Sequence, residues 1–173
     1  MTDIATSTDA ATPAPDITDP RTPEQRNTYF DNAKCMLQLR NGQVVELKPF
    51  GDYTGLDFSG SVLQGVRVVN ANFDHANFTN CILSYSDFEG SSFNHAIFKD
   101  VEMEVTNFGY CTAEYAQFKA EEAGNVSFRN ARLNFTTFEG CIEYATFENA
   151  KLFGCVFNAA CHFSLNFQNA AVI

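Results

Sequence analysis

A large apolar residue returns every five positions along most of the chain. Between positions 69 and 98 these residues are Phe73, Phe78, Leu83, Phe88, Phe93 and Phe98. Two positions before each of them stands a small residue, in order Ala71, Ala76, Cys81, Ser86, Ser91 and Ala96. A helix or a flat strand would send a five-residue repeat to several faces, because their side-chain periods are 3.6 and 2.0. A chain that turns a corner every five residues would instead point all these positions at one central axis.

The pattern runs from Leu56 to Ile173, with one residue missing between Phe138 and Ile142. If four five-residue units make one coil, every fourth large residue falls in the same column. One column is then Phe58, Phe78, Phe98, Phe118, Phe138 and Phe157, and a second is Val68, Phe88, Phe108, Phe128, Phe147 and Phe167. Phenylalanine rings in such columns can stack from coil to coil. We therefore predict an all-β fold, a four-sided parallel β-helix of about six coils with a filled interior.

Three breaks in the pattern lead to local predictions. Glu121 falls in an inward small position, and an unpaired buried carboxylate is costly, so residues 121–124 should bulge outward. The missing residue should tighten a corner near Gly140. His162 is expected to point inward in the last full coil as a hydrogen-bonded cap residue rather than as a ligand.

The chain before the repeats is expected to form a tail and a cap. Residues 1–19 are rich in Thr, Ala, Asp and Pro and predict a disordered tail. Residues 20–55 predict an N-terminal cap, in which Thr22 and Pro23 begin a short helix that runs to about Lys34. Residues 35–48 then predict a β-hairpin, with Asn41-Gly42 in a type I′ turn.

The repeats, such as Ala71-Asn72-Phe73 and Ala76-Asn77-Phe78, resemble those of the pentapeptide-repeat family, whose pattern is A-(N/D)-(L/F)-x-x. The resemblance covers residues 56–173 and implies a right-handed quadrilateral β-helix. Family members that protect DNA gyrase from quinolones are understood as mimics of DNA, and they usually end in a helix that pairs two rods. This chain ends still in repeat phase, so we expect either a homodimer through the C-terminal end or a frayed last coil.

Composition narrows the function classes. The formal net charge is -10, which argues against direct nucleic-acid binding because such proteins normally carry a basic stripe. The six cysteines show no CxxC pair and no zinc-type spacing, so we expect reduced structural thiols. The sequence begins without a signal-peptide pattern and contains no apolar run of about 20 residues, which favours a cytoplasmic protein and no membrane partner.

No catalytic constellation is apparent, so we expect no enzyme activity, no cofactor and no metal. His75 and His95 should share an outward corner one coil apart, where two imidazoles could bind a metal. Tyr115 and Phe135 continue that corner and provide no third ligand. Whether Cys141 and Cys161, on neighbouring coils, can pair stays open.

Two outer surfaces are candidate partner sites. The first, here called the aromatic corner, consists of His75, His95, Tyr115 and Phe135. The second, here called the acidic wall, consists of Glu102, Glu104, Glu122 and Glu143. The aromatic corner could bind a protein partner or pack against the predicted helix around Tyr29 and Phe30. The acidic wall could imitate the phosphates of DNA or only keep the rod soluble.

The leading hypothesis is a non-enzymatic scaffold that mediates protein-protein interaction. The alternative is an acidic DNA mimic that binds or modulates DNA gyrase or another topoisomerase. The partner's identity is not indicated by any residue.

Overall fold

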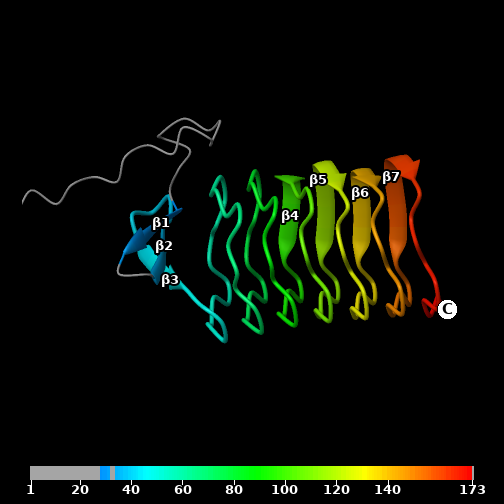
Figure 1. Cartoon of the computed structure of the whole chain (residues 1–173), viewed down its shortest axis with the longest axis horizontal. Coiled ribbons are helices and arrows are strands. Elements are labelled where there is room, and N and C mark those ends of the chain that lie inside the picture. Colours follow the sequence, from blue (N-terminus) through cyan, green and yellow to red (C-terminus); the bar gives the residue numbers. More distant parts are fainter. Residues whose placement is uncertain (1–27, 32–33, 173) are drawn as a thin grey trace, which may run out of the picture.

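Successive turns of the chain stack parallel to one another and form a rod, with the C-terminus at one end and a small sheet at the other (Figure 1). The structure is a computed structural model. It describes the backbone of residues 28–31 and 34–172 and the side chains of residues 35–158 and 164–172. Within these residues every regular element is a strand, as the five-residue pattern predicts.

Bridges between parallel segments join residues that lie twenty positions apart. Asp52 pairs with Asn72, Asn72 with Ser92, and Ser92 with Thr112. Across the missing residue the offset falls to nineteen, as in the pairing of Ser127 with Thr146, and it returns to twenty in the pairing of Thr146 with Asn166. An offset of twenty is the one that four five-residue units per coil predict. The bridges already include Asp52, slightly before Leu56, where the apolar pattern becomes regular.

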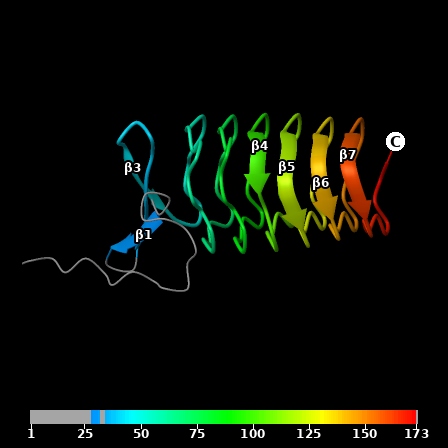
Figure 2. The same cartoon turned by 90° about the horizontal axis from the view of Figure 1, so that it is seen from above.

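On one side of the rod the coils extend into longer strands. They are β4 (Ile97–Glu102), β5 (Gln117–Gly124), β6 (Thr137–Glu143) and β7 (Val156–Phe163). These strands are parallel and lie in the order β4-β5-β6-β7, which Figure 2 shows from above. Their register pairs Phe98 with Phe118 and Phe118 with Phe138, so residues of one column meet directly.

The interior of the rod is filled by stacked rings. Along the column from Phe58 to Phe157, neighbouring ring centroids are 4.3–5.3 Å apart and their planes differ by 3–10°. The column from Phe88 to Phe167 stacks at 5.1–5.6 Å. The two columns meet edge to face, for example Phe98 and Phe108 at 5.8 Å and 84°. Both predicted phenylalanine columns are confirmed, and offset and edge-to-face ring pairs are the favourable geometries.

The small inward positions have a second role where they are polar. The Ser91 hydroxyl donates to the Val68 carbonyl at 3.1 Å, and Thr106 donates to Leu83 at 3.1 Å. The Cys81 thiol donates in the same way to the Phe58 carbonyl at 3.0 Å. Burial raises the pKa of the Cys81 thiol to about 12, and it also raises the pKa of Cys111. Both thiols are therefore compact core groups and poor nucleophiles.

The corners depend on residues in the left-handed backbone region, one in almost every five-residue unit. The φ angles are 61° at His75, 59° at His95, 58° at Tyr115 and 60° at Phe135. Asparagine, aspartate, histidine and glycine tolerate this region, whereas a β-branched residue such as Val105, with φ of 52°, is strained there. The corner position therefore has a backbone requirement that is independent of its outward side chain.

The predicted outward bulge of residues 121–124 is confirmed at Glu121 and Glu122, whereas Ala123 is buried. Ala120 is buried and takes the inward place, while Glu121 and Glu122 are exposed. The register shifts here, because Ala120 pairs with Gly140 and Ala123 pairs with Ile142. The extra residue of β5 lies opposite the shortened coil, so the bulge and the missing residue belong to one irregularity.

Gly140 lies at this irregularity, where the tightened corner was predicted. Its φ is 87°, and a Cβ at this position would overlap the carbonyl oxygen of Ala120. The close approach of two backbones therefore requires glycine.

A three-stranded antiparallel sheet lies at the N-terminal end of the rod (Figure 1). Its strands are β1 (Thr28–Asp31), β2 (Lys34–Gln38) and β3 (Val44–Leu47). The predicted helix is wrong over residues 28–31, since these pair with β2 from Thr28–Leu37 to Asp31–Lys34. Thr28, Tyr29 and Phe30 favour strands, and pairing with β2 satisfies their backbone groups.

The predicted hairpin of β2 and β3 is confirmed, but its turn differs from the expected type I′. Only Gly42 of the Asn41-Gly42 pair has a positive φ, at 85°. The Gly42 amide donates to the Leu39 carbonyl at 2.9 Å, and the Leu39 amide donates to Gln43 at 2.8 Å. This is a three-residue loop in which glycine follows a tight turn, another common hairpin connection.

Some predictions concern parts of the chain outside the described residues. These are the tail over residues 1–19, the helix start at Thr22, and the side chains of Cys161 and His162.

The strain at Val105 can be tested by substitution. Val105→Asn should raise the free energy of unfolding by about 1 kcal/mol, because asparagine tolerates positive φ better than a β-branched residue. The reverse exchange at another corner, Asn130→Val, should lower it by a similar amount. Denaturant titration measures both, and an unchanged or lower stability of Val105→Asn would contradict the role of the corner backbone.

The buried thiols predict a loss of stability at alkaline pH. Above the ordinary thiol pKa of about 8.5, the unfolded chain loses protons that the folded chain keeps, so stability falls as pH rises. Each thiol should contribute about 1 to 2 kcal/mol of this loss at pH 10. Cys81→Ala/Cys111→Ala should show a flatter decline between pH 8 and pH 10 than the natural protein. Equal declines would show that these thiols do not ionise on unfolding.

Candidate functional site

The aromatic corner forms a continuous stack of outward rings, one from each of four successive coils. His75 and His95 have ring centroids 4.9 Å apart and planes that differ by 2°. His95 and Tyr115 stack at 5.2 Å and 4°, and Tyr115 and Phe135 stack at 4.9 Å and 10°. The four predicted residues are thus brought together. The tyrosine ring is 50% exposed and the phenylalanine ring 42% exposed.

The backbone places these rings at equal intervals. Each corner amide donates to a carbonyl of the next coil: His75 to Asn94 at 2.8 Å, and His95 to Glu114 at 2.9 Å. Tyr115 continues the series by donating to Asn134 at 3.1 Å. Since all four corner residues share nearly the same φ, their side chains leave the rod in parallel. The aromatic corner therefore has a fixed spacing between its rings.

Phe153 closes the C-terminal end of this stack. Its ring meets Phe135 edge to face at 5.1 Å and 89°. The next corner residue is Gly154, where a Cβ would lie 2.6 Å from Cδ1 of Phe135. The Phe135 ring can therefore lie over this coil only because residue 154 is glycine.

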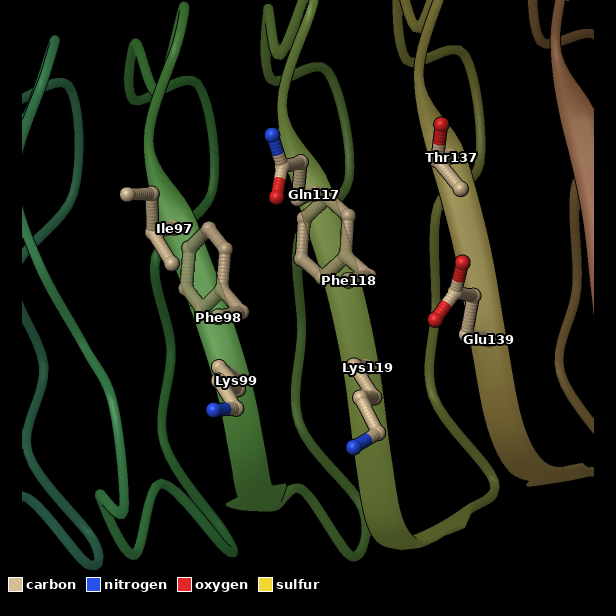
Figure 3. A pocket seen from close by; sticks show the side chains of 8 residues that line it. All are labelled: Ile97, Phe98, Lys99, Gln117, Phe118, Lys119, Thr137 and Glu139. Atoms are coloured by element: carbon tan, nitrogen blue, oxygen red, sulfur yellow. The ribbon is translucent and has the colours of Figure 1, made fainter.

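A shallow groove of about 350 Å³ crosses β4, β5 and β6 beside the aromatic corner. In Figure 3 one row of side chains is Ile97, Gln117 and Thr137, and the other is Lys99, Lys119 and Glu139. The first row begins two residues after the corner positions of the same coils, so the groove adjoins the stack. The Lys119 ammonium lies 3.1 Å from Asp100 Oδ1. The groove thus has the aromatic corner on one side and a row of mixed charge, Lys99, Lys119 and Glu139, on the other.

The acidic wall lies on the face that follows this groove around the rod. Glu102 and Glu122 are paired in the register of β4 and β5, and Glu143 pairs with Gly124. Two shallow grooves of about 250 Å³ and 160 Å³ share Glu104 and Glu122 in their linings. A Cβ on Gly124 would overlap the Glu104 carboxylate, so this glycine makes room for it. The four predicted glutamates are thus brought onto one face.

The four glutamates of the acidic wall lack the basic partners that several other acidic residues of the rod have. Elsewhere Arg67 Nε lies 3.1 Å from Asp87 Oδ2, and Arg132 Nε lies 2.8 Å from Glu114 Oε1. The Arg132 guanidinium, with the amide of Asn134, holds the pKa of Glu114 below its ordinary value. Within the described part of the chain, none of the four wall glutamates has an ion pair. Their negative charge is left uncompensated by nearby cations.

The stack geometry is unsuited to metal binding by the two histidines. A metal lies close to the plane of the imidazole that binds it, at about 2.0 to 2.1 Å from the nitrogen for zinc. The parallel planes of His75 and His95 are offset by a centroid distance of 4.9 Å, so one ion cannot lie in both. In the described residues no group of three or more His, Cys, Asp or Glu side chains could hold a metal ion.

The open question of Cys141 and Cys161 is answered only for the backbone. The register of β6 and β7 makes them direct neighbours on adjacent strands. The side chain of Cys161 lies outside the described residues.

The described residues contain no helix with the length and apolar character needed to cross a bilayer.

Comparison with protein families gives two matches, both to pentapeptide repeats. The model "Pentapeptide repeat region" matches residues 71–146, and the model "Pentapeptide repeats (8 copies)" matches residues 52–80. The chain belongs to the pentapeptide-repeat family. The family forms a β-helix, which agrees with the coils described above, and it is generally non-catalytic. Comparison with curated protein sequences gives no significant match.

Solved structures of other pentapeptide-repeat proteins are similar to this one at low sequence identity. A protein from the Arabidopsis thaliana thylakoid lumen is 24% identical over 58% of this chain and 64% of its own, with a TM-score of 0.40. Full-length QnrB1, a plasmid-mediated fluoroquinolone resistance protein, is 16% identical over 72% of this chain and 92% of its own, with a TM-score of 0.34. HetL, which is involved in heterocyst differentiation regulation in the cyanobacterium Nostoc, is 14% identical over 60% of both chains, with a TM-score of 0.25. The partner of this pentapeptide-repeat protein must therefore be inferred from its own surface.

Several features of the site lie beyond the five-residue pattern. Phe153 meets the last ring of the stack edge to face, and this contact depends on the glycine that follows it. The groove of β4 to β6 lies between two rows of outward side chains that differ in length. The five-residue pattern does not specify these outward residues. The corner positions before and after the four rings are glycines, Gly55 and Gly154, and these glycines could have indicated from the sequence where the stack ends.

Proposed function

We propose that this pentapeptide-repeat protein is a non-enzymatic scaffold that binds a protein partner through the aromatic corner and the adjoining groove. The observation that carries the proposal is the stack of four outward rings on four coils. Exposed aromatic residues that lie in a line are the kind of anchor that dominates protein interfaces.

The rigidity of the surface supports this function. Ring spacing is set by the coil repeat, so the rings need no reordering before a partner binds, and binding loses less conformational entropy. The groove beside them adds the Lys99 and Lys119 ammonium groups and the Glu139 carboxylate, which can pair with charged groups of a partner segment. The filled interior supports a role on the outer surface, since the large buried side chains occupy the axis.

Affinity capture from a lysate of the source organism tests the proposal when it compares matched variants. In Tyr115→Asn/Phe135→Asn both rings are removed, and asparagine suits the positive φ of these corners. Proteins captured by the natural chain should be depleted about tenfold or more in this variant, corresponding to ~1.4 kcal/mol.

The control for that experiment is Tyr85→Asn/Tyr110→Asn. These tyrosines are also exposed corner residues with positive φ, but they lie outside the ring stack. The control should capture the same proteins as the natural chain. Equal capture by both variants, or no protein captured by the natural chain, would contradict the proposed interface.

A second candidate function is favoured by the uncompensated charge of the acidic wall. Glu102 and Glu122 lie opposite one another on neighbouring coils, and Glu104 and Glu143 line the same grooves as Glu122, so one side of the rod presents carboxylates as duplex DNA presents phosphates. We infer that a protein with a DNA-binding surface, such as gyrase or another topoisomerase, would be the partner of this face.

A supercoiling assay with purified gyrase tests the second candidate. An excess of the natural protein should change the supercoiling rate, and Glu102→Gln/Glu104→Gln/Glu122→Gln/Glu143→Gln should abolish the change. The control variant Asp52→Asn/Asp57→Asn/Glu89→Gln/Glu139→Gln alters the net charge equally and should keep it. A supercoiling rate that does not respond to the natural protein removes this candidate.

A further inference from the structure

The two ends of the ring stack differ. In chain order the corner positions are Gly55, His75, His95, Tyr115, Phe135 and Gly154. At the C-terminal end Phe153 covers the last ring, and Phe135 occupies the space over Gly154. At the N-terminal end no atom of the described residues lies within 4 Å of the place that a Cβ of Gly55 would take. The stack is therefore closed at one end and open at the other.

The backbone at Gly55 is the same as at the corners that carry rings. Its φ is 69°, and its amide donates to the Asp74 carbonyl at 2.8 Å, one coil before the equivalent bond of His75. A side chain on residue 55 would thus leave the rod in parallel with His75. Since neighbouring rings lie 4.9–5.2 Å apart, the space beside Gly55 matches one missing ring of the stack.

The outward face of the His75 imidazole borders this space. Its other face is covered by His95, and no ring of the described residues covers the face toward Gly55. Three carboxylates, Asp52, Asp57 and Asp74, lie within three positions of Gly55 or His75 along the chain. They disfavour a ligand with a phosphate group and leave a neutral or cationic planar ring as the suitable occupant.

We propose that the space between Gly55 and His75 is a binding site for one planar aromatic side chain of a protein partner. The partner's ring stacks on His75 and extends the ladder by one ring. This inference rests on the proposed function, because it names the group that a partner inserts at one end of the aromatic corner. Glycine at position 55 is the residue that keeps the site open.

The probe for this site is N-acetyl-L-tryptophanamide, a neutral amide with an aromatic ring. Only three histidines are present, so the ring protons of His75 and His95 can be followed by NMR during a titration. The natural protein should show a saturable upfield shift at His75 and a smaller one at His95, because a stacked indole shields the nearer imidazole. A titration without a saturable shift at His75 would overturn the proposal.

Matched variants distinguish the site from weak binding elsewhere. Gly55→Tyr should fill the space with the protein's own ring and weaken probe binding at least tenfold. Gly65→Tyr is the control, because Gly65 has a φ of 71° and open space at its Cβ but lies on another corner. It should bind the probe like the natural protein. Unchanged binding by Gly55→Tyr, or an equal loss in both variants, would overturn the proposal.

A second variant guards against misfolding of Gly55→Tyr. His75→Asn removes the imidazole, and asparagine suits the positive φ of this corner. Because the His75 ring protons are then absent, binding is followed on the probe by saturation-transfer NMR, and the signal of the probe should fall at least tenfold. An undiminished signal would overturn the proposal. The outcome is separable from that of the proposed function, since capture through Tyr115 and Phe135 does not require an open Gly55.

Discussion

The structure depends on a backbone turn into the left-handed region at almost every fifth residue. The turn sends the chain around a corner, and four such corners bring it back beside the residue twenty positions earlier. Most side chains disfavour this region, so the repeated corners must be compensated by what they bring together. The compensation is the stacking of buried phenylalanine rings and the amide-to-carbonyl bonds from coil to coil.

The same constraint determines where function can lie. Large and small inward residues fill the axis of the rod, which leaves the outer faces and corners for binding. Any outward residue type that recurs every twenty positions becomes a column at coil spacing. The aromatic corner is such a column, and in the acidic wall Glu102 and Glu122 meet in the same way on neighbouring coils.

The sequence predicts the repeating part of this protein well because one period controls many residues. Phe118 could be placed between Phe98 and Phe138 from spacing alone, and the exposure of Glu121 followed from the cost of burying a carboxylate. The strand at residues 28–31 was missed because a capping signal at Thr22 favoured a helix while pairing with β2 was not visible locally. The open space at Gly55 could not be predicted for a different reason. The positive φ of a corner is enough to explain a glycine there, and the missing ring is recognised only once the neighbouring His75 is known to belong to a stack.

The central claim is that residues twenty positions apart lie in contact on the outer corners. Nuclear Overhauser effects from the His95 ring test this most directly, since His95 has a candidate neighbour at each of two spacings. Stacking at 5.2 Å predicts cross-peaks between the rings of His95 and Tyr115. Cross-peaks from His95 to Tyr110, fifteen positions away, with none to Tyr115, would indicate three units per coil and contradict the account.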